Sequence, residues 1–186
     1  MLRKVAKYTK LLRYMRLKNS TRIRVGKLVL NLDNNIHRSE GLWRLMVLLD
    51  ALDSGIIAEL DYSSLSLKFC IDLIKFEVSL NHYSYVALRH VTMLHLFGAK
   101  FENDIVHLPQ GIMLRYPRED PFALGCIIEI FCKSQYGFLN VSRKMVADVG
   151  AYIGDSAIYF ALRGAKKVAC YEPHPILYRY LIENVK

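Results

Sequence analysis

The chain lacks the long apolar segments that mark membrane and secreted proteins. No apolar run reaches the ~18 residues that a membrane span needs. The best candidate, Phe122 to Cys132, is short and carries Glu129. The first residues carry charges every few positions and contain no uninterrupted apolar stretch of the kind found in signal peptides. We therefore expect a cytoplasmic protein.

Paired cysteines and metal-ligand spacings are also missing. The four cysteines form no C-x-x-C pair, and Cys126 and Cys170 have apolar neighbours, which favours reduced core residues over a disulfide framework. His90 and His95 are five residues apart, so a helix would not place them on one face for a metal. We expect no metal site, and we find no internal repeat or low-complexity segment.

Acidic residues are absent from the first 28 positions, which hold ten of the 26 Lys and Arg residues. The other 16 bases nearly balance the 17 acids, so the formal net charge of +9 belongs to segment 1–28. Residues 2–18 fit an amphipathic helix. Its basic face could be solvated while the apolar stripe packs on the protein, could lie peripherally on an anionic membrane surface, or could bind nucleic-acid phosphates.

Helical periodicity dominates residues 29–100. Segments 42–53 and 83–97 are predicted helices, ended by Ser54-Gly55 and by Gly98. Segment 65–80 alternates like a strand and then changes phase, so its periodicity fits neither a single strand nor a single helix. We expect a mainly helical N-terminal region over 29–100.

Residues 101–144 show a different pattern. Ile105–Leu108 and Ile112–Arg115 flank Pro-Gln-Gly and predict a β-hairpin. Pro121 suits the first position of a helix that would run to about residue 133.

An α/β pattern begins at Met145. Met145 to Val149 is typical of a central parallel strand that is buried on both faces, and Asp148 near its end requires hydrogen-bond donors or a ligand cation. Gly150 permits a sharp bend and close ligand approach. Asp155 or Ser156 could then cap a helix that ends near residue 164.

A second strand, residues 167–171, leads to Glu172, which lies 24 residues after Asp148. In doubly wound folds, an acid roughly 20 residues on, at the end of the second strand, accepts hydrogen bonds from ribose hydroxyls. Segment 145–186 therefore predicts the start of a Rossmann-like, nucleoside-binding domain. A βαβ unit with coincidental acids is the alternative.

The motif also limits the ligand. Tyr152 and Asp155 replace the second and third glycines of the dinucleotide fingerprint, and their bulk and charge oppose a pyrophosphate. A P-loop is excluded because no G-K-[ST] occurs. An adenosine ligand with a cationic end and no phosphates fits best, and S-adenosylmethionine is such a ligand.

The same residues resemble the FkbM family of class I S-adenosylmethionine-dependent methyltransferases. The likeness covers about residues 124–186 and includes Asp148-Val-Gly-Ala-Tyr-Ile-Gly-Asp155, Glu172-Pro-His-Pro175 and Glu183-Asn184. It implies O-methyl transfer to a hydroxyl of a small molecule or sugar. By this resemblance, Asp148, Gly150 and Gly154 would line the methionine end of the cofactor and Glu172 would hold its ribose. Ala151, Tyr152, Asp155 and Pro173 are the other expected cofactor-binding residues.

The later strands of such a domain do not follow in this sequence. We therefore expect a truncated or split form that a second polypeptide could complete, and its catalytic base cannot be named. Two other functions stay open: a non-enzymatic helical adaptor or basic binding module, and a nicotinamide oxidoreductase, against which Tyr152 and Asp155 argue.

Overall fold

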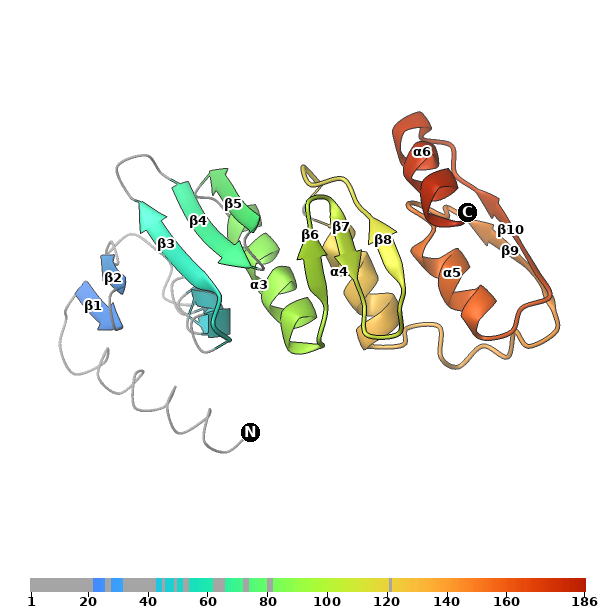
Figure 1. The fold of residues 1–186 in the computed structure, drawn as a ribbon, viewed down its shortest axis with the longest axis horizontal. Helices are drawn as coiled ribbons and strands as arrows, with labels where there is room; N and C mark the ends of the chain where they lie inside the picture. Colours follow the sequence, from blue (N-terminus) through green and yellow to red (C-terminus); the bar gives the residue numbers. More distant parts are fainter. Residues whose placement is uncertain are drawn as a thin grey trace.

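The computed structural model describes residues 22–25, 28–31, 43–44, 46–48, 50–51, 54–61, 66–71, 74–79, 82–120 and 122–186. These residues form a mixed α/β arrangement of small sheets and helices, which follow one another along the long axis of the molecule (Figure 1). The helix predicted over 2–18 lies outside the described residues.

Strands dominate the first part of the described chain. β1 (Arg22–Val25) pairs antiparallel with β2 (Leu28–Asn31). β3 (Ile57–Asp61), β4 (Ser66–Ile71) and β5 (Ile74–Ser79) form an antiparallel three-stranded sheet. The region 29–100, which was predicted to be mainly helical, therefore contains strands as well as helices.

The change of phase in segment 65–80 has a simple structural origin. Ile71 at the end of β4 lies opposite Ile74 at the start of β5. The alternation is therefore that of two separate strands, and it restarts where the chain reverses. The predicted helix at 42–53 agrees with the structure, because the described residues between 43 and 51 are helical. Gly55, with φ of 79°, follows that helix.

Helix α3 (His82–Leu96) ends as predicted, since Gly98 adopts the left-handed conformation with φ of 93°. The predicted hairpin is confirmed by β7 (Ile105–His107) and β8 (Met113–Arg115), which pair antiparallel. β6 (Lys100–Glu102), which was not predicted from the sequence, adds a third strand beside β7.

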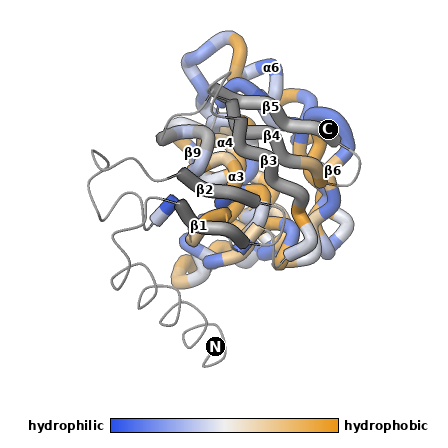
Figure 2. Tube along the Cα trace, turned by 90° about the vertical axis from the view of Figure 1, so that its left-hand side faces the viewer, coloured by the Kyte–Doolittle hydropathy of each residue, from blue (hydrophilic) through white to orange (hydrophobic). Residues whose placement is uncertain are grey.

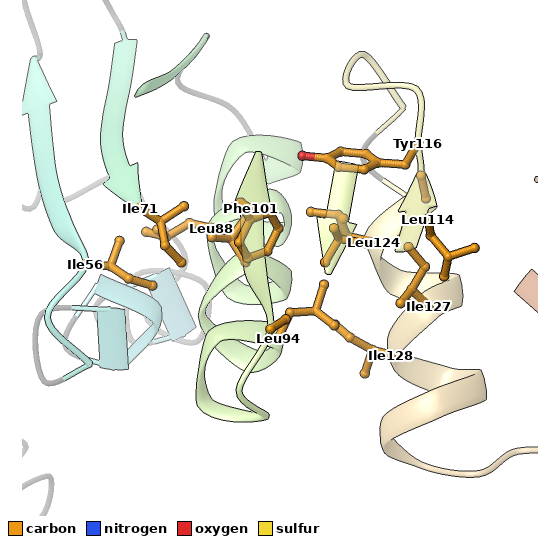
Figure 3. Close-up of a cluster of buried hydrophobic side chains, with 14 of the residues drawn as sticks. Ile56, Ile71, Leu88, Leu94, Phe101, Leu114, Tyr116, Leu124, Ile127 and Ile128 are labelled. Atoms are coloured by element: carbon orange, nitrogen blue, oxygen red, sulfur yellow. The ribbon is translucent and has the colours of Figure 1, made fainter. Parts of the chain in front are cut away.

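The main hydrophobic core lies between the sheet β6–β7–β8 and the helices. Phe101, Val106 and Leu114 are cross-strand neighbours, one from each strand, and all three are buried. Figure 3 shows two of them with the core side chains of α3 and of the helix that follows β8. The labelled residues of that close-up are Ile56, Ile71, Leu88, Leu94, Phe101, Leu114, Tyr116, Leu124, Ile127 and Ile128.

The helix predicted from Pro121 is present but irregular. α4 (Ala123–Ile127) continues directly into a π-helical turn, η1 (Ile128–Cys132), in which the Lys133 N–H donates to the Ile128 carbonyl. Such π-helical turns inside helices are frequent at functional sites. Figure 2, which looks along the molecule, shows hydrophobic stretches of α3 in the interior and hydrophilic stretches at the periphery near α6 (Pro175–Asn184).

The C-terminal part has the predicted order of elements. β9 (Met145–Val149), α5 (Asp155–Leu162), β10 (Lys167–Tyr171) and α6 follow one another, and β9 and β10 pair in parallel. The expectation that β9 is buried on both faces was wrong, because Met145 is 73% exposed and Val149 is 81% exposed. In the described part of the chain, β9 pairs with β10 alone and no helix covers this face.

None of the helices among the described residues combines the length and apolarity that crossing a membrane requires.

Candidate functional site

The carboxyl ends of β9 and β10 meet at one edge of their small sheet. Asp148 lies opposite Cys170 in the parallel register, and Val149 lies opposite Tyr171. Glu172 follows directly after Tyr171, so both predicted acids lie at this edge. Asp148 obtains the donor that a half-buried carboxylate needs, because the Ser156 hydroxyl donates to its Oδ2 at 2.7 Å.

The bend from Gly150 to Gly154 depends on left-handed backbone at three positions. Gly150, Tyr152 and Gly154 have φ of 79°, 48° and 88°. The N–H groups of Gly150 and Ala151 both donate to the Tyr171 carbonyl, at 2.8 and 3.1 Å. A Cβ on Gly154 would come within 3.1 Å of side-chain atoms of Leu181 in α6, so only glycine fits there without strain.

Glu172 connects this bend to the start of α6. Its Oε2 accepts from the Tyr152 N–H at 2.9 Å, and its Oε1 accepts from the His174 N–H at 2.8 Å. A carboxylate has about four acceptor positions, so each oxygen can accept a further hydrogen bond. Glu172 is half-buried at the surface of the bend, where its remaining acceptor positions can face a ligand.

The Tyr152 side chain joins the bend to the segment before α4. Its hydroxyl donates to Asp120 Oδ2, and the Phe122 N–H donates to the other oxygen of the same carboxylate. Burial, together with the Asp120 carboxylate, raises the pKa of the Tyr152 phenol well above its usual range. This side chain is therefore a neutral hydrogen-bond donor at physiological pH.

A cavity of about 440 Å³ lies between this bend and the helices α3, α4 and η1. Three of the predicted site residues line it, namely Gly150, Tyr152 and Asp155. Asp148, Ala151, Gly154, Glu172 and Pro173 do not. The remaining lining residues are Val86, His90, Phe122, Gly125, Cys126, Glu129, Ile130, Gln135, Tyr136 and Ser156.

Asp155 is the acid that reaches the cavity. The prediction that Asp155 or Ser156 caps α5 was wrong, because Gly154 occupies the N-cap position and no side chain caps the helix. Instead, Asp155 Oδ1 accepts from the Ser156 N–H at 3.1 Å. The residue is only 2% exposed, and burial raises the pKa of its carboxyl to about 6, with a smaller contribution from the Asp148 carboxylate.

Several lining residues carried no sequence signal of their own. Val86 and His90 belong to α3, more than 50 residues before the motif, and only the tertiary fold brings them to the cavity. The His90 ring packs on Gly125, where a Cβ would lie 2.8 Å from its Cε1. Burial raises the pKa of the Cys126 thiol to about 11, so this cysteine is a neutral wall residue.

Asn184, the last residue of α6, connects the bend to the sheet β6–β7–β8. Its Nδ2 donates to the carbonyls of Arg115 and Ile153, at 2.9 and 2.8 Å, and its Oδ1 accepts from the Arg115 N–H at 2.8 Å. The side-chain amide therefore pairs with β8 much as a neighbouring strand would. In the sequence, Glu183-Asn184 is only part of a family likeness, and this role of Asn184 was not predicted.

No group of three or more potential metal ligands gathers anywhere in the described ranges. No protein-family model, no curated protein and no solved structure matches this chain.

Proposed function

We propose that this chain forms the nucleoside-binding part of an S-adenosylmethionine-dependent methyltransferase of the class I, Rossmann-like type. The proposal combines the family resemblance of segment 124–186 with the geometry of the bend between β9 and α5. The acceptor would be a hydroxyl of a small molecule or a sugar, as that resemblance implies.

One observation carries the proposal: the first two parallel strands end side by side, and the second delivers Glu172 to the bend that follows the first. This is the arrangement in which doubly wound folds bind a nucleoside, with the ribose at the acid that ends the second strand. Glu172 already holds the backbone of Tyr152, so a bound ribose would meet a carboxylate whose position is fixed.

The residues present fit S-adenosylmethionine better than a dinucleotide. The bend carries Tyr152 and Asp155 at the positions where a pyrophosphate would need bare backbone and positive potential. Asp155 is buried beside a cavity that no lysine or arginine lines, which suits a cationic ligand and opposes a phosphate. When bound, this cofactor supplies an electrophilic methyl group on its sulfonium.

The exposed face of β9 and β10 fits a larger sheet, and a second polypeptide that pairs with β9 is part of the proposal. Met145, Val149 and Tyr171 expose apolar surface there, and β9 pairs with β10 alone within the described part of the chain, so its other edge can accept a further strand. Such a partner would contribute the groups that face the acceptor.

Calorimetric titration of the full chain with S-adenosylhomocysteine, the demethylated product, tests the function. We expect saturable binding that Glu172→Ala weakens by about tenfold or more, because two ribose hydrogen bonds to a charged group are lost. Glu102→Ala is the matched control, since Glu102 lies on β6 in a different sheet and should leave the affinity unchanged.

Two results would contradict the proposal. One is the absence of binding by a wild-type chain whose circular dichroism shows a folded protein. The other is tighter binding of NAD than of S-adenosylhomocysteine, which would favour the oxidoreductase alternative.

A further inference from the structure

Part of the cavity wall comes from residues upstream of the segment that resembles a known family. Val86 and His90 of α3 and Phe122, just before α4, line the cavity, whereas the resemblance covers only about residues 124–186. Tyr83, Val86 and His90 are separated by three and four residues, so they lie on the same face of α3. This upstream wall (Val86, His90 and Phe122) is therefore a feature of the chain that the resemblance does not account for.

Two aromatic side chains meet where the upstream wall reaches solvent. Phe122 lines the cavity and is nevertheless 57% exposed, so it lies at the mouth. The Tyr83 ring contacts it edge to face, with ring centroids 6.1 Å apart and planes inclined by 78°. This contact restrains the Phe122 ring, and its exposed area offers a flat apolar surface to a ligand.

The charges around the cavity are negative. Glu129 and Asp155 line it, no lysine or arginine does, and one histidine is the only basic residue in the lining. Burial raises the pKa of the Cys126 thiol, in the same wall, to about 11. Three carboxylates add to this effect, namely those of Asp155, Asp120 and Glu129. An anionic ligand would bring a further negative charge beside these groups, so the cavity opposes it.

The cavity also needs a hydrogen-bond donor that its wall does not supply. Asp155 is 2% exposed, and its Oδ1 accepts from the Ser156 N–H. Its Oδ2 is buried with no hydrogen-bond partner among the described residues. A buried carboxylate oxygen without a donor is costly, so we expect the occupant of the cavity to bring donors. Hydroxyl groups donate, whereas ionised carboxylates only accept.

We propose that the methyl acceptor is an uncharged ring that bears hydroxyl groups and lies with its apolar face on Phe122 at the mouth of the cavity. The inference rests on the proposed function, because it gives this ring the role of acceptor. It deepens that function by excluding acidic acceptors and by making Phe122, supported by Tyr83, a specificity-determining residue. A sugar and a phenol share the required chemistry.

Two matched pairs of probes test the selection by charge. Methyl β-glucoside and phenol are the uncharged rings, and methyl β-glucuronide and 4-hydroxybenzoate are their anionic counterparts. Saturation-transfer NMR measures their binding to the full chain in the presence of saturating S-adenosylhomocysteine. We expect at least one uncharged ring to bind, at least about tenfold more tightly than its anionic counterpart. The uncharged ring that binds more tightly identifies the acceptor as a sugar or a phenol.

Variants in the wall test the two parts of the inference separately. Phe122→Ala should weaken binding of the uncharged ring at least about fivefold, and Tyr83→Ala, which removes the supporting contact, about threefold. Phe138→Ala is the matched control, because Phe138 is 81% exposed and does not line the cavity. Glu129→Gln keeps the shape of the side chain and removes its charge, so the anionic counterpart should bind at least about threefold more tightly.

The outcomes separate the inference from the proposed function. If the chain binds S-adenosylhomocysteine but neither uncharged ring, the inference is wrong and the function stands. Equal affinity for the two members of a pair also overturns the inference, as does a Phe122→Ala variant that is folded by circular dichroism and keeps wild-type affinity for the ring. If a folded chain binds a ring but no S-adenosylhomocysteine, the proposed function fails, and the role of the ring as acceptor fails with it.

Discussion

The sheets β6–β7–β8 and β9–β10 are both small, but the first buries its apolar side chains whereas the second leaves several of its own exposed. The first turns Phe101, Val106 and Leu114 towards α3 and α4, and Val106 and Leu114 are 0% exposed. The second covers one face with α5 and leaves Met145 and Val149 on the other face 73% and 81% exposed. The first sheet is therefore part of a closed core, whereas the second presents an open apolar face.

The candidate site lies where these two regions meet. Its inner wall comes from α3, α4 and η1 of the closed region, and its bend comes from the chain between β9 and α5. Asn184 and Tyr152 fasten the bend to the closed region through the backbone of Arg115 and the carboxylate of Asp120. The closed region thus positions the site, while the open face is free to contact another surface.

Truncation of a core side chain should give the largest effect and should distinguish the two sheets directly. Leu114→Ala removes a fully buried side chain of β8 from the main core, and we expect it to lower the free energy of unfolding by about 2–5 kcal/mol. Val149→Ala on the open face should lower it by less than about 0.5 kcal/mol. Urea unfolding followed by circular dichroism measures both. Similar losses for the two variants would show that the face of β9 is covered in solution.

Asp155 should give the next largest effect, with the opposite sign. Burial raises the pKa of its carboxyl from 3.8 to about 6, so the folded chain binds this proton more tightly than the unfolded chain does. Stability therefore falls as pH rises between these values, and the full cost above about pH 6 is about 3 kcal/mol. Cys126, Tyr152, Glu129 and His90 line the same cavity as Asp155, and the nearby Asp148 carboxylate contributes to its raised pKa.

Asp155→Asn lacks this cost, so we expect it to raise the free energy of unfolding by up to about 3 kcal/mol near pH 8, with the gain disappearing near pH 4. Thermal unfolding of unliganded protein at several pH values provides the measurement. A variant that is less stable than wild type at high pH would show that Asp155 has a stabilising partner in the folded chain. A more stable variant that loses ligand binding would show that the site trades stability for recognition.

The contact that joins the two regions should give an intermediate effect. Asn184→Ala removes three hydrogen bonds and leaves the N–H and carbonyl of Arg115 unpaired, which should cost about 1–3 kcal/mol. Asn184→Asp keeps the acceptor for the Arg115 N–H but loses both Nδ2 bonds, so it should also be destabilising. Asn140→Ala, at an exposed loop position, is the control and should be neutral. Unchanged stability in Asn184→Ala would mean that the regions are held together without this amide.

The sequence was sufficient for elements whose signals are local. Gly98 and the Pro-Gln-Gly turn predicted the end of α3 and the β7–β8 hairpin, because left-handed backbone and turn chemistry restrict which residues fit. The order strand, bend, helix, strand and acid predicted β9 to Glu172 for the same reason. Such predictions from local sequence patterns need no knowledge of what packs against each element.

Features that depend on distant neighbours could not be predicted in this way. The apolar run of β9 is compatible with burial on both faces, and only the tertiary arrangement shows that one face is open. His90 reaches the cavity through the packing of α3, and Asn184 reaches β8 across 69 residues of chain. The same limit applies to Asp155, since its position at a helix start suggested a cap, whereas the cavity beside it decides its environment.

The open face itself should give the smallest change in stability and a clear change in surface chemistry. Val149→Lys places a charge among the exposed apolar residues of β9 and β10, and we expect weaker fluorescence of a hydrophobic dye such as anilinonaphthalene sulfonate. Unfolding free energy should stay within about 0.5 kcal/mol of wild type.

Phe138→Lys is matched in exposure, since both side chains are 81% exposed, but Phe138 lies in a loop outside the sheet face. A contiguous face binds dye better than an isolated side chain, so Val149→Lys should lower the fluorescence more than Phe138→Lys. Equal decreases would indicate that β9 and β10 present scattered apolar residues rather than one surface, and the contrast between the two sheets would then concern burial alone.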